Sequence, residues 1–272
     1  MINKRIISYY GGKARLADRL IEWMPDHDNY FEAFAGGLSV FFKKKKAKWS
    51  AVNDLDSDIS NLYYVCSRKD LFKEFKELAF YLVQSKDIYD IIRENIKEGK
   101  GKFEIPNVQR AVDYFFYIST SFNNRPGTSL SKNANKWGND LLEKVAYSRK
   151  KMEDVYISNM DVNDFIDKYI GTEKAFWFFD PPYYVANDTE YYSHVFRRYH
   201  HERFSKSIKK LATKSNANIM ITYDDHPKVR ELFDGFYIKE VGVKYSSTYE
   251  TVDTNEIVIT NYELYDNQQS LF

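Results

Sequence analysis

Short apolar runs alternate along the chain with longer stretches in which apolar residues recur at helical spacing. Phe176, Trp177, Phe178 and Phe179 form the most apolar run, as expected of a strand buried on both faces of a parallel sheet. We expect further strands at residues 30–34, 49–53, 155–158 and 217–223, and an edge hairpin made by residues 237–245 and 256–262. We expect helices near residues 14–24, 62–96, 108–119, 141–152, 162–169 and 227–233, with a helix or a second turn at 38–42. This pattern predicts an α/β fold.

Composition narrows the class of protein. The 272 residues allow one sizeable domain, or one domain with an insertion, and 43% hydrophobic residues suffice for a packed core. The single Cys66 excludes a disulfide framework and a cysteine-based metal site, and the five histidines show no metal-ligand spacing. Because no signal peptide or membrane-spanning run is recognisable, we expect a soluble, cytoplasmic protein with no membrane partner and no metal. The net charge of +1 means that any surface for nucleic acid must be local.

The central apolar run ends at Asp180, which is followed by Pro181 and Pro182. Proline cannot donate a ladder hydrogen bond, so strand pairing stops at this point, where open α/β sheets bind ligands. The Asp180 carboxylate and the Pro181 carbonyl would offer two acceptors to an amino group, and the rings of Tyr183 and Tyr184 would cover a flat heterocycle. A plain turn is the alternative, but the buried strand before the motif and the tyrosine after it favour a functional loop.

Two glycine turns precede this loop. Gly11 and Gly12 stand before the first expected helix, where Lys13 adds a cation, although a plain turn would show the same pattern. Gly36 lies in a tight turn after the first expected strand. Asp54 ends the second strand about 20 residues later, which is the spacing between a glycine turn and a ribose-binding acid in Rossmann-like sheets.

Other charged residues nearby are interpreted as structural. Asp56 and Asp58 are rivals of Asp54 for the ribose, and we expect them to be helix-capping or surface groups. The four lysines at 43–46 indicate a solvated helix end rather than a binding patch.

Two segments carry side chains suited to nucleic acid. Residues 114–138 contain no acidic residue, and their polar and turn residues predict a loop or hairpin. The amide and cationic side chains of this first segment include Asn123, Asn124, Arg125, Lys132, Asn133, Asn135 and Lys136. Because Arg and Asn bond base edges, we expect this segment to read bases; an ordinary mobile loop is the alternative. The basic stretch 192–214, with Arg197 and Arg198 near its start, would bind phosphates or form a solvated helix face.

Together, several motifs resemble the Dam-type DNA adenine-N6 methyltransferases. The similarity covers nearly the whole chain except about residues 66–154, and the motifs occur in the order of that family. The matching segments are Tyr9-Tyr10-Gly11-Gly12-Lys13, Phe31-Glu32-Ala33-Phe34-Ala35-Gly36-Gly37, Asn53-Asp54, Asp161, Asp180-Pro181-Pro182-Tyr183, Ile221-Thr222-Tyr223-Asp224-Asp225 and residues 256–262. The chain departs from the family at Ala33, where members usually have proline, and at Leu38, where many have a further glycine.

The resemblance implies a Rossmann-like methyltransferase sheet, mostly parallel with an antiparallel edge hairpin. Residues 1–65 and 155–272 would form the catalytic domain, and residues 66–154 an inserted, mainly helical domain that recognises DNA. The cofactor would be S-adenosylmethionine, surrounded by Tyr9, Gly11, Gly12, Lys13, Glu32, Phe34, Gly36, Asp54, Asp161 and Asp180. Within this set Asp54 would hold the ribose and Asp161 would lie near the adenine of the cofactor.

The implied reaction is methyl transfer to the N6 amino group of adenine in duplex DNA, by base flipping and direct in-line attack. The catalytic residues would be Asp180, Pro181, Pro182 and Tyr183, with Tyr183 stacked on the flipped base. Residues expected to bind DNA are Asn123, Asn124, Arg125, Lys132, Lys136, Arg197 and Arg198. The alternatives are methylation of RNA adenine or of cytosine N4, and a non-catalytic DNA-binding protein on the same fold. A cognate restriction endonuclease would be a second partner.

Overall fold

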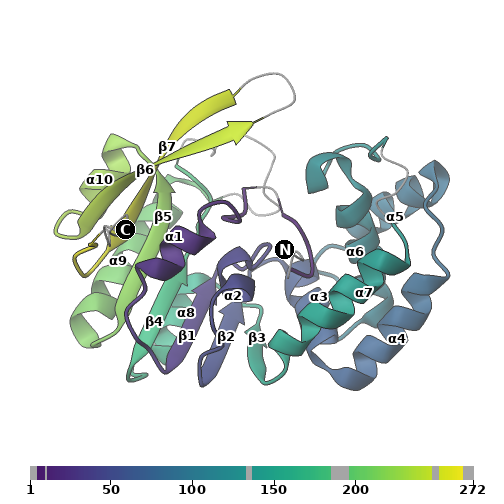
Figure 1. Cartoon of the computed structure of the whole chain (residues 1–272), viewed down its shortest axis with the longest axis horizontal. Coiled ribbons are helices and arrows are strands. Elements are labelled where there is room, and N and C mark those ends of the chain that lie inside the picture. The colour runs from purple at the N-terminus through teal and green to yellow at the C-terminus, as the bar shows by residue number, and fades with distance from the viewer. Residues whose placement is uncertain (1–4, 10, 133–136, 185–195, 247–250, 266–272) are drawn as a thin grey trace, which may run out of the picture.

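A seven-stranded sheet forms the centre of the protein, in the strand order β3-β2-β1-β4-β5-β7-β6 (Figure 1). The structure is a computed structural model, and it describes residues 5–9, 11–132, 137–184, 196–246 and 251–265. The strands are β1 (Asn29–Ala33), β2 (Trp49–Asn53), β3 (Val155–Ser158), β4 (Ala175–Phe179), β5 (Asn218–Asp224), β6 (Tyr237–Ser246) and β7 (Thr251–Thr260). The first five are parallel, whereas β7 runs antiparallel to both β5 and β6. The expected mostly parallel sheet with an antiparallel edge hairpin is therefore confirmed.

Alternate residues of the central strands pack on opposite faces of the sheet. In β4, Phe176 and Phe178 join one apolar cluster, and Trp177 and Phe179 join the other. All five residues of β4 are buried, as the uninterrupted apolar run predicted. Trp177 stacks on Phe31 of the neighbouring β1, with ring centroids 4.0 Å apart.

Helices cover both faces. The first cluster contains residues of α1 (Ala17–Glu22) and α2 (Ser39–Lys43), and the second contains residues of α8 (Val162–Tyr169), α9 (Arg198–Lys214) and α10 (Pro227–Leu232). A helical region lies between β2 and β3 in the chain and gathers beyond the β3 edge of the sheet (Figure 1). It consists of α3 (Ser57–Ser67), α4 (Lys69–Phe80), α5 (Lys86–Glu98), α6 (Val108–Thr120), η1 (Phe122–Asn124), α7 (Asn139–Ser148) and η2 (Arg149–Met152). Its apolar side chains continue the first cluster, so the helical region and the sheet share a core.

Two expectations from the sequence need correction. Residues 114–120 belong to the buried end of α6 and are not part of a loop: Phe115, Phe116 and Ile118 are fully buried, and α6 packs against α3, α4 and α5. The loop begins at Ser121, which forms a β-bridge with Leu130. In the lysine run, Lys43, Lys45 and Lys46 are exposed at the end of α2 as expected, but Lys44 is 5% exposed and lies over the Tyr30 ring, 4.2 Å from its centroid.

Among the described residues, no helix has both the length and the apolar character needed to span a membrane.

Candidate active site

The carboxyl ends of β1, β4 and β5 meet at one edge of the sheet. Ala33 is paired with Phe179, and Phe179 is paired with Ile221, so the residues that follow these positions lie side by side. The strand order also changes direction between β1 and β4, because later strands are added on the β4 side and β2 and β3 on the other. Such switch points are where open α/β sheets bind their ligands.

Asp180 stands at this edge with two polar partners. Its Oδ1 lies 2.8 Å from Lys13 Nζ and accepts a hydrogen bond of 2.6 Å from the Thr222 hydroxyl on β5. Lys13 also donates to the Gly11 carbonyl at 2.9 Å, and the Lys13 side chain is only 4% exposed. Burial raises the pKa of the Asp180 carboxyl, and the Lys13 ammonium and the Thr222 hydroxyl counteract this rise. The N-terminal glycine turn thus supplies the cation that faces the end of β4.

The residues after Asp180 are held by side chains from β5. The ring of Tyr183 stacks on Tyr223 with centroids 6.4 Å apart, and Lys13 Nζ lies 4.8 Å from the centroid of the Tyr183 ring. The Tyr184 backbone amide donates to Asp224 Oδ1 at 2.8 Å. Pro181 is buried, and Pro182, Tyr183 and Tyr184 are half-buried. The loop therefore has a fixed course and presents the Tyr183 ring beside Lys13.

Behind the loop, Tyr223 and His201 form a buried hydrogen-bonded pair. The Tyr223 hydroxyl lies 2.5 Å from His201 Nδ1, and the His201 ring is also 5.0 Å from that of Tyr184. Burial lowers the pKa of His201 to about 4, so the imidazole is neutral at physiological pH. The pair thus contacts both tyrosines of the loop, since Tyr223 packs on Tyr183 and His201 packs on Tyr184.

The second glycine turn packs against the first. A Cβ on Gly37 would lie 3.2 Å from Tyr9 Cβ, and one on Gly12 would lie 3.1 Å from the Tyr9 carbonyl oxygen, so both positions leave little room for a side chain. Leu38 has a φ of +47°, a left-handed backbone conformation that favours glycine. Phe34 also has a positive φ, +59°, and its ring makes edge contacts with Phe196 and Phe204.

Glu32 is buried, and its carboxyl group is hydrogen-bonded to neighbouring groups of the protein. Its Oε2 accepts hydrogen bonds from the Tyr30 hydroxyl at 2.5 Å and from the Phe41 backbone amide in α2 at 3.0 Å. Burial, with a contribution from the nearby Asp180 charge, raises the pKa of Glu32 to about 8. Glu32 thus secures α2 behind the glycine turn, a structural role that the sequence did not suggest.

Asp54 and Asp161 follow the adjacent strands β2 and β3. The half-buried Asp54 carboxylate accepts from the Gly36 amide on Oδ2 and from the Asp56 amide on Oδ1, both at 2.9 Å. Burial, and then the Asp56 carboxylate, raise the pKa of Asp54 to about 7. Asp161 caps α8 by accepting from the Asn163 amide at 2.9 Å. Asp54 therefore has direct contact with the second glycine turn.

The rival acids have different positions. Asp56 caps α3 as expected, because its Oδ1 accepts from the Asp58 amide at 2.9 Å. Asp58 is neither a cap nor a surface group: it is 2% exposed and forms a two-point ion pair with Arg110. Asp and Arg are seldom fully buried unless they are paired in this way.

The residues expected to bind DNA fall into two groups. Residues 121–131 form a tight loop beyond α6, in which Asn123 and Asn124 both have a left-handed backbone. The Gly127 amide donates to the Tyr117 hydroxyl at 2.6 Å, and the Tyr89 hydroxyl donates to the Thr128 carbonyl at 2.7 Å. Two helices thus hold the loop.

The exposure of these DNA candidates differs. Asn123 and Lys132 are exposed, whereas Arg125 is half-buried. Arg197 and Arg198 are exposed at the start of α9. Lys136 lies outside the described residues, as do Asn133, Asn135 and Tyr10.

Sequence reasoning assigned no role to Thr222, Tyr223 or His201. Thr222 and Tyr223 lie in one of the family-like segments, but their contacts with Asp180 and Tyr183 depend on β5 lying next to β4. His201 lies in the basic stretch, and no local pattern marks it as buried.

Two solved structures align with most of this chain. A precorrin-8w decarboxylase from Methanobacterium thermoautotrophicum aligns with 91% of this chain and 87% of its own, with 8% identity and a TM-score of 0.36. A SAM-dependent methyltransferase from Agrobacterium tumefaciens aligns with 90% of this chain and 59% of its own, with 9% identity and a TM-score of 0.39. Similarities this weak carry no functional conclusion.

None of the curated proteins matches the sequence. The profile of the D12 class N6 adenine-specific DNA methyltransferases matches residues 9–247, and the chain therefore belongs to this family.

Proposed function

We propose that the protein transfers a methyl group from S-adenosylmethionine to the N6 amino group of adenine in duplex DNA. The observation that carries the proposal is the buried contact between Asp180 and Lys13 at the carboxyl end of β4, beside the Tyr183 ring. It combines a fixed acceptor for an amino group with an aromatic surface for a base. Family membership gives the reaction class, and these residues supply the groups that the reaction needs.

The chemistry of the amino group explains the need for Asp180. The lone pair of the adenine N6 nitrogen is delocalised into the ring, which makes it a poor nucleophile. An acceptor at the Asp180 carboxylate and a second at the Pro181 carbonyl would draw the two N–H bonds out of the ring plane. Asp180 must be ionised for this task, and Lys13 favours that form despite the burial of the carboxyl. The contribution of these residues is positioning and electrostatics.

The residues around the second glycine turn fit the proposed cofactor. Asp54 is half-buried and still has lone pairs on both oxygens, because each accepts only one backbone hydrogen bond among those described above. A carboxylate held in this way can accept hydrogen bonds from ribose hydroxyls. Tyr9 packs closely on Gly36 and Gly37 of the same glycine turn. Asp161 at the end of β3 is the candidate for the adenine side. When bound, S-adenosylmethionine supplies an activated methyl group on a sulfonium.

Residues 66–154, which include most of the helical region, are the proposed target-recognition part. A base must leave the duplex to reach Asp180, which costs a few kcal/mol. Tyr183 is the proposed platform for the flipped base, since its ring is half-buried and backed by Tyr223. The anchored loop 121–131 would read bases with Asn123, Asn124 and Arg125, and the exposed cations Lys132, Arg197 and Arg198 would bind phosphates.

The test is methyl transfer from S-adenosylmethionine with a labelled methyl group, followed by digestion of the product to nucleosides. We expect the label in N6-methyladenine after incubation with duplex DNA, and none with a folded Asp180→Ala variant. Label in N4-methylcytosine, or in RNA only, would replace the substrate assignment. Absence of transfer to any nucleic acid by the folded wild-type protein would support the non-catalytic alternative and overturn the proposal.

A further inference from the structure

Three alternate aspartates connect the end of β2 to the start of α3. The Asp54 carboxylate accepts from the Asp56 amide, and the Asp56 carboxylate accepts from the Asp58 amide, in both cases at 2.9 Å. Each side chain therefore fixes the backbone of the next, and the first of them also holds the Gly36 amide. The arrangement brings three acids together in a region where Asp56 and Asp58 are 4% and 2% exposed.

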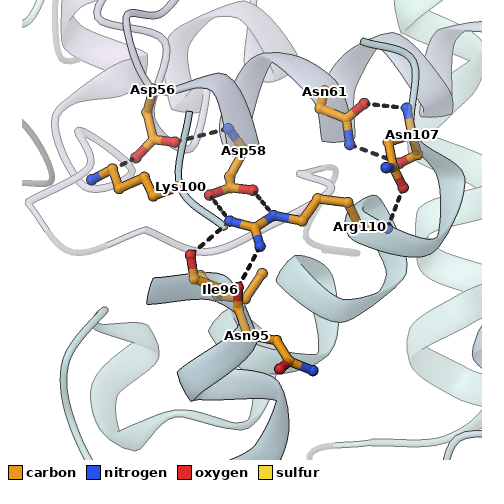
Figure 2. A network of polar contacts seen from close by, with 8 residues as sticks. All are labelled: Asp56, Asp58, Asn61, Asn95, Ile96, Lys100, Asn107 and Arg110. Atoms are coloured by element: carbon orange, nitrogen blue, oxygen red, sulfur yellow. Dashed lines mark hydrogen bonds and ion pairs between the residues drawn. The ribbon is translucent and has the colours of Figure 1, made fainter. Parts of the chain in front are cut away.

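The cations that face these acids come from the helical region (Figure 2). Arg110 on α6 donates to both oxygens of Asp58, from Nε at 2.6 Å and from a terminal nitrogen at 2.9 Å. The same guanidinium donates to the carbonyls of Asn95 and Ile96 near the end of α5, at 2.8 Å and 2.7 Å. Lys100, which follows α5, places Nζ 3.9 Å from Asp56 Oδ2.

A second contact fixes the start of α6 to α3. The Asn61 side chain donates to the Asn107 carbonyl and accepts from the Asn107 amide, both at 2.8 Å. The Asn107 side chain in turn accepts from the Arg110 amide and caps α6 (Figure 2). The position of Arg110 is thus fixed by its own helix as well as by Asp58.

We propose that Lys100 and Arg110 are positioning residues of the cofactor site, which balance the charge of the Asp54–Asp56–Asp58 chain and fix its geometry. Asp54 would then present an ionised carboxylate to the ribose. The helical region would complete the cofactor site in addition to recognising DNA. This inference rests on the proposed function, because it assumes that Asp54 binds the cofactor.

The charges around Asp54 support this role. Burial and the Asp56 charge raise the pKa of Asp54, and Lys100 lowers it; burial also raises the pKa of Asp58, while Arg110 and Lys100 lower it. The charged and titratable groups that act on Asp54 or respond to it are Asp56, Lys100, Tyr63 and Tyr114, whereas Arg110 acts on Asp58. Loss of the Lys100 ammonium should therefore raise the pH needed for a charged Asp54. Loss of Arg110 should affect Asp54 through Asp58 and the hydrogen bonds that connect the three acids.

Lys100 allows a test with little risk to folding, because its side chain is 31% exposed. We would measure the affinity of the full chain for S-adenosylmethionine by calorimetry, without DNA, from about pH 6 to about pH 9. We expect Lys100→Gln to weaken binding about 1.5- to 2-fold near pH 7, and to shift the loss of affinity to higher pH by a few tenths of a unit. Lys100→Arg should keep the wild-type profile. Lys102→Gln is the matched control, because Lys102 is exposed and only two residues away.

Arg110 is tested with Arg110→Lys and Arg110→Gln, each checked for folding by circular dichroism. We expect a folded Arg110→Gln protein to weaken binding of S-adenosylmethionine with a smaller shift of the pH profile than Lys100→Gln gives, because Arg110 acts on Asp58 and reaches Asp54 only through the acid chain. Arg110→Lys should recover part of the affinity. Identical profiles for Lys100→Gln, Lys102→Gln and the wild type would overturn the role of Lys100. A wild-type protein that binds no S-adenosylmethionine at any pH would instead overturn the proposed function itself.

Discussion

Lys13 Nζ lies 2.8 Å from Asp180 Oδ1, so a residue of the N-terminal glycine turn reaches the end of the central strand β4. The two side chains are 4% and 19% exposed, which limits screening by water. Lys13 also lies 4.8 Å from the centroid of the Tyr183 ring. One cation therefore sets the charge of the proposed amino-group acceptor and contacts the proposed base platform.

We expect Lys13→Met to lower the rate of methyl transfer about 10- to 100-fold, because hydrogen bonds to charged groups contribute ~1.5–3 kcal/mol. The pKa of Asp180 is already raised by burial and would rise further without the ammonium. In the proposed reaction Asp180 acts as a carboxylate, so the acid limb of the pH–rate profile should move to higher pH. Single-turnover rates across pH measure both effects, and Lys13→Arg should recover part of the rate. A wild-type profile for Lys13→Met would refute this role.

Thr222→Val tests the second partner of Asp180. Valine keeps the shape of threonine and removes the hydroxyl that donates to Asp180 Oδ1 at 2.6 Å. We expect a rate reduction of roughly 10-fold, since one bond to a charged acceptor is lost. Thr222→Ser retains the hydroxyl and is the control. Equal rates for the valine and serine variants would show that this hydrogen bond does not assist catalysis.

The sequence predicted the strands well because a turn or polar residue bounds each of them. The expected limits of β2 and β3, residues 49–53 and 155–158, are those observed. The partners of Asp180 were harder to predict from the sequence. Thr222 is 42 residues away from it in the chain, and their contact depends on the β4–β5 register that pairs Phe179 with Ile221. No local periodicity encodes that register.

Composition was misleading where one segment spans two environments. Residues 114–138 lack acids throughout, but the first seven belong to a helix whose apolar side chains are buried. The helical pattern from Val108 was the better guide there, because it continued through Ile118. The expectation that Asp58 is a helix-capping or surface group was also wrong, because its partner Arg110 is 52 residues away in the chain and only the fold brings the two side chains together.

Asp54→Asn should weaken binding of S-adenosylmethionine by ~1.5–3 kcal/mol, because the ribose hydroxyls would lose a charged acceptor. In the wild type, the pKa of Asp54 is about 7, so affinity should fall as the pH is lowered through about 7. Because the pKa of Asp54 is higher in the folded protein than in the unfolded chain, protonation of the Asp54 carboxyl stabilises the apo protein. This contribution to the free energy of unfolding is complete below about pH 4 and is lost as the pH rises towards about 7. Calorimetry across pH measures the binding effect. The exposed Asp164→Asn variant is the control, and unchanged affinity in Asp54→Asn would assign the ribose to another residue.

The ion pair between Asp58 and Arg110 should be costly to break from one side. We expect Arg110→Met to lower the free energy of unfolding by ~3–5 kcal/mol, because it leaves a buried carboxylate and two carbonyls of α5 without their donor. Adding Asp58→Asn to this variant should recover part of the loss, since the unpaired charge is removed. Urea unfolding of both single variants and the double variant measures the coupling. A double variant as destabilised as the sum of the two single variants would contradict it.

The loop 121–131 offers the sharpest test of sequence recognition. Its ends are joined by the bridge between Ser121 and Leu130, and Thr128 Oγ1 donates to the Arg125 carbonyl at 2.7 Å. The backbone at Arg125 is therefore fixed, whereas Lys132 is exposed just beyond the bridge. A fixed arginine can bond one guanine at two points, which contributes ~1–3 kcal/mol of discrimination, but a flexible lysine can bond phosphates of any sequence.

We therefore expect Arg125→Ala to relax the preference at one base pair, and Lys132→Ala to slow methylation of all sites alike and to reduce the salt dependence of binding by about one ion. Methylation rates over a library of duplex sites, measured for each variant at two salt concentrations, separate the two effects. Arg125 is half-buried, so the folding of Arg125→Ala is checked first by thermal unfolding. If Arg125→Ala lowers every rate by one common factor, Arg125 contacts the DNA backbone, and base recognition must lie with other residues such as Asn123 at the exposed side of the loop.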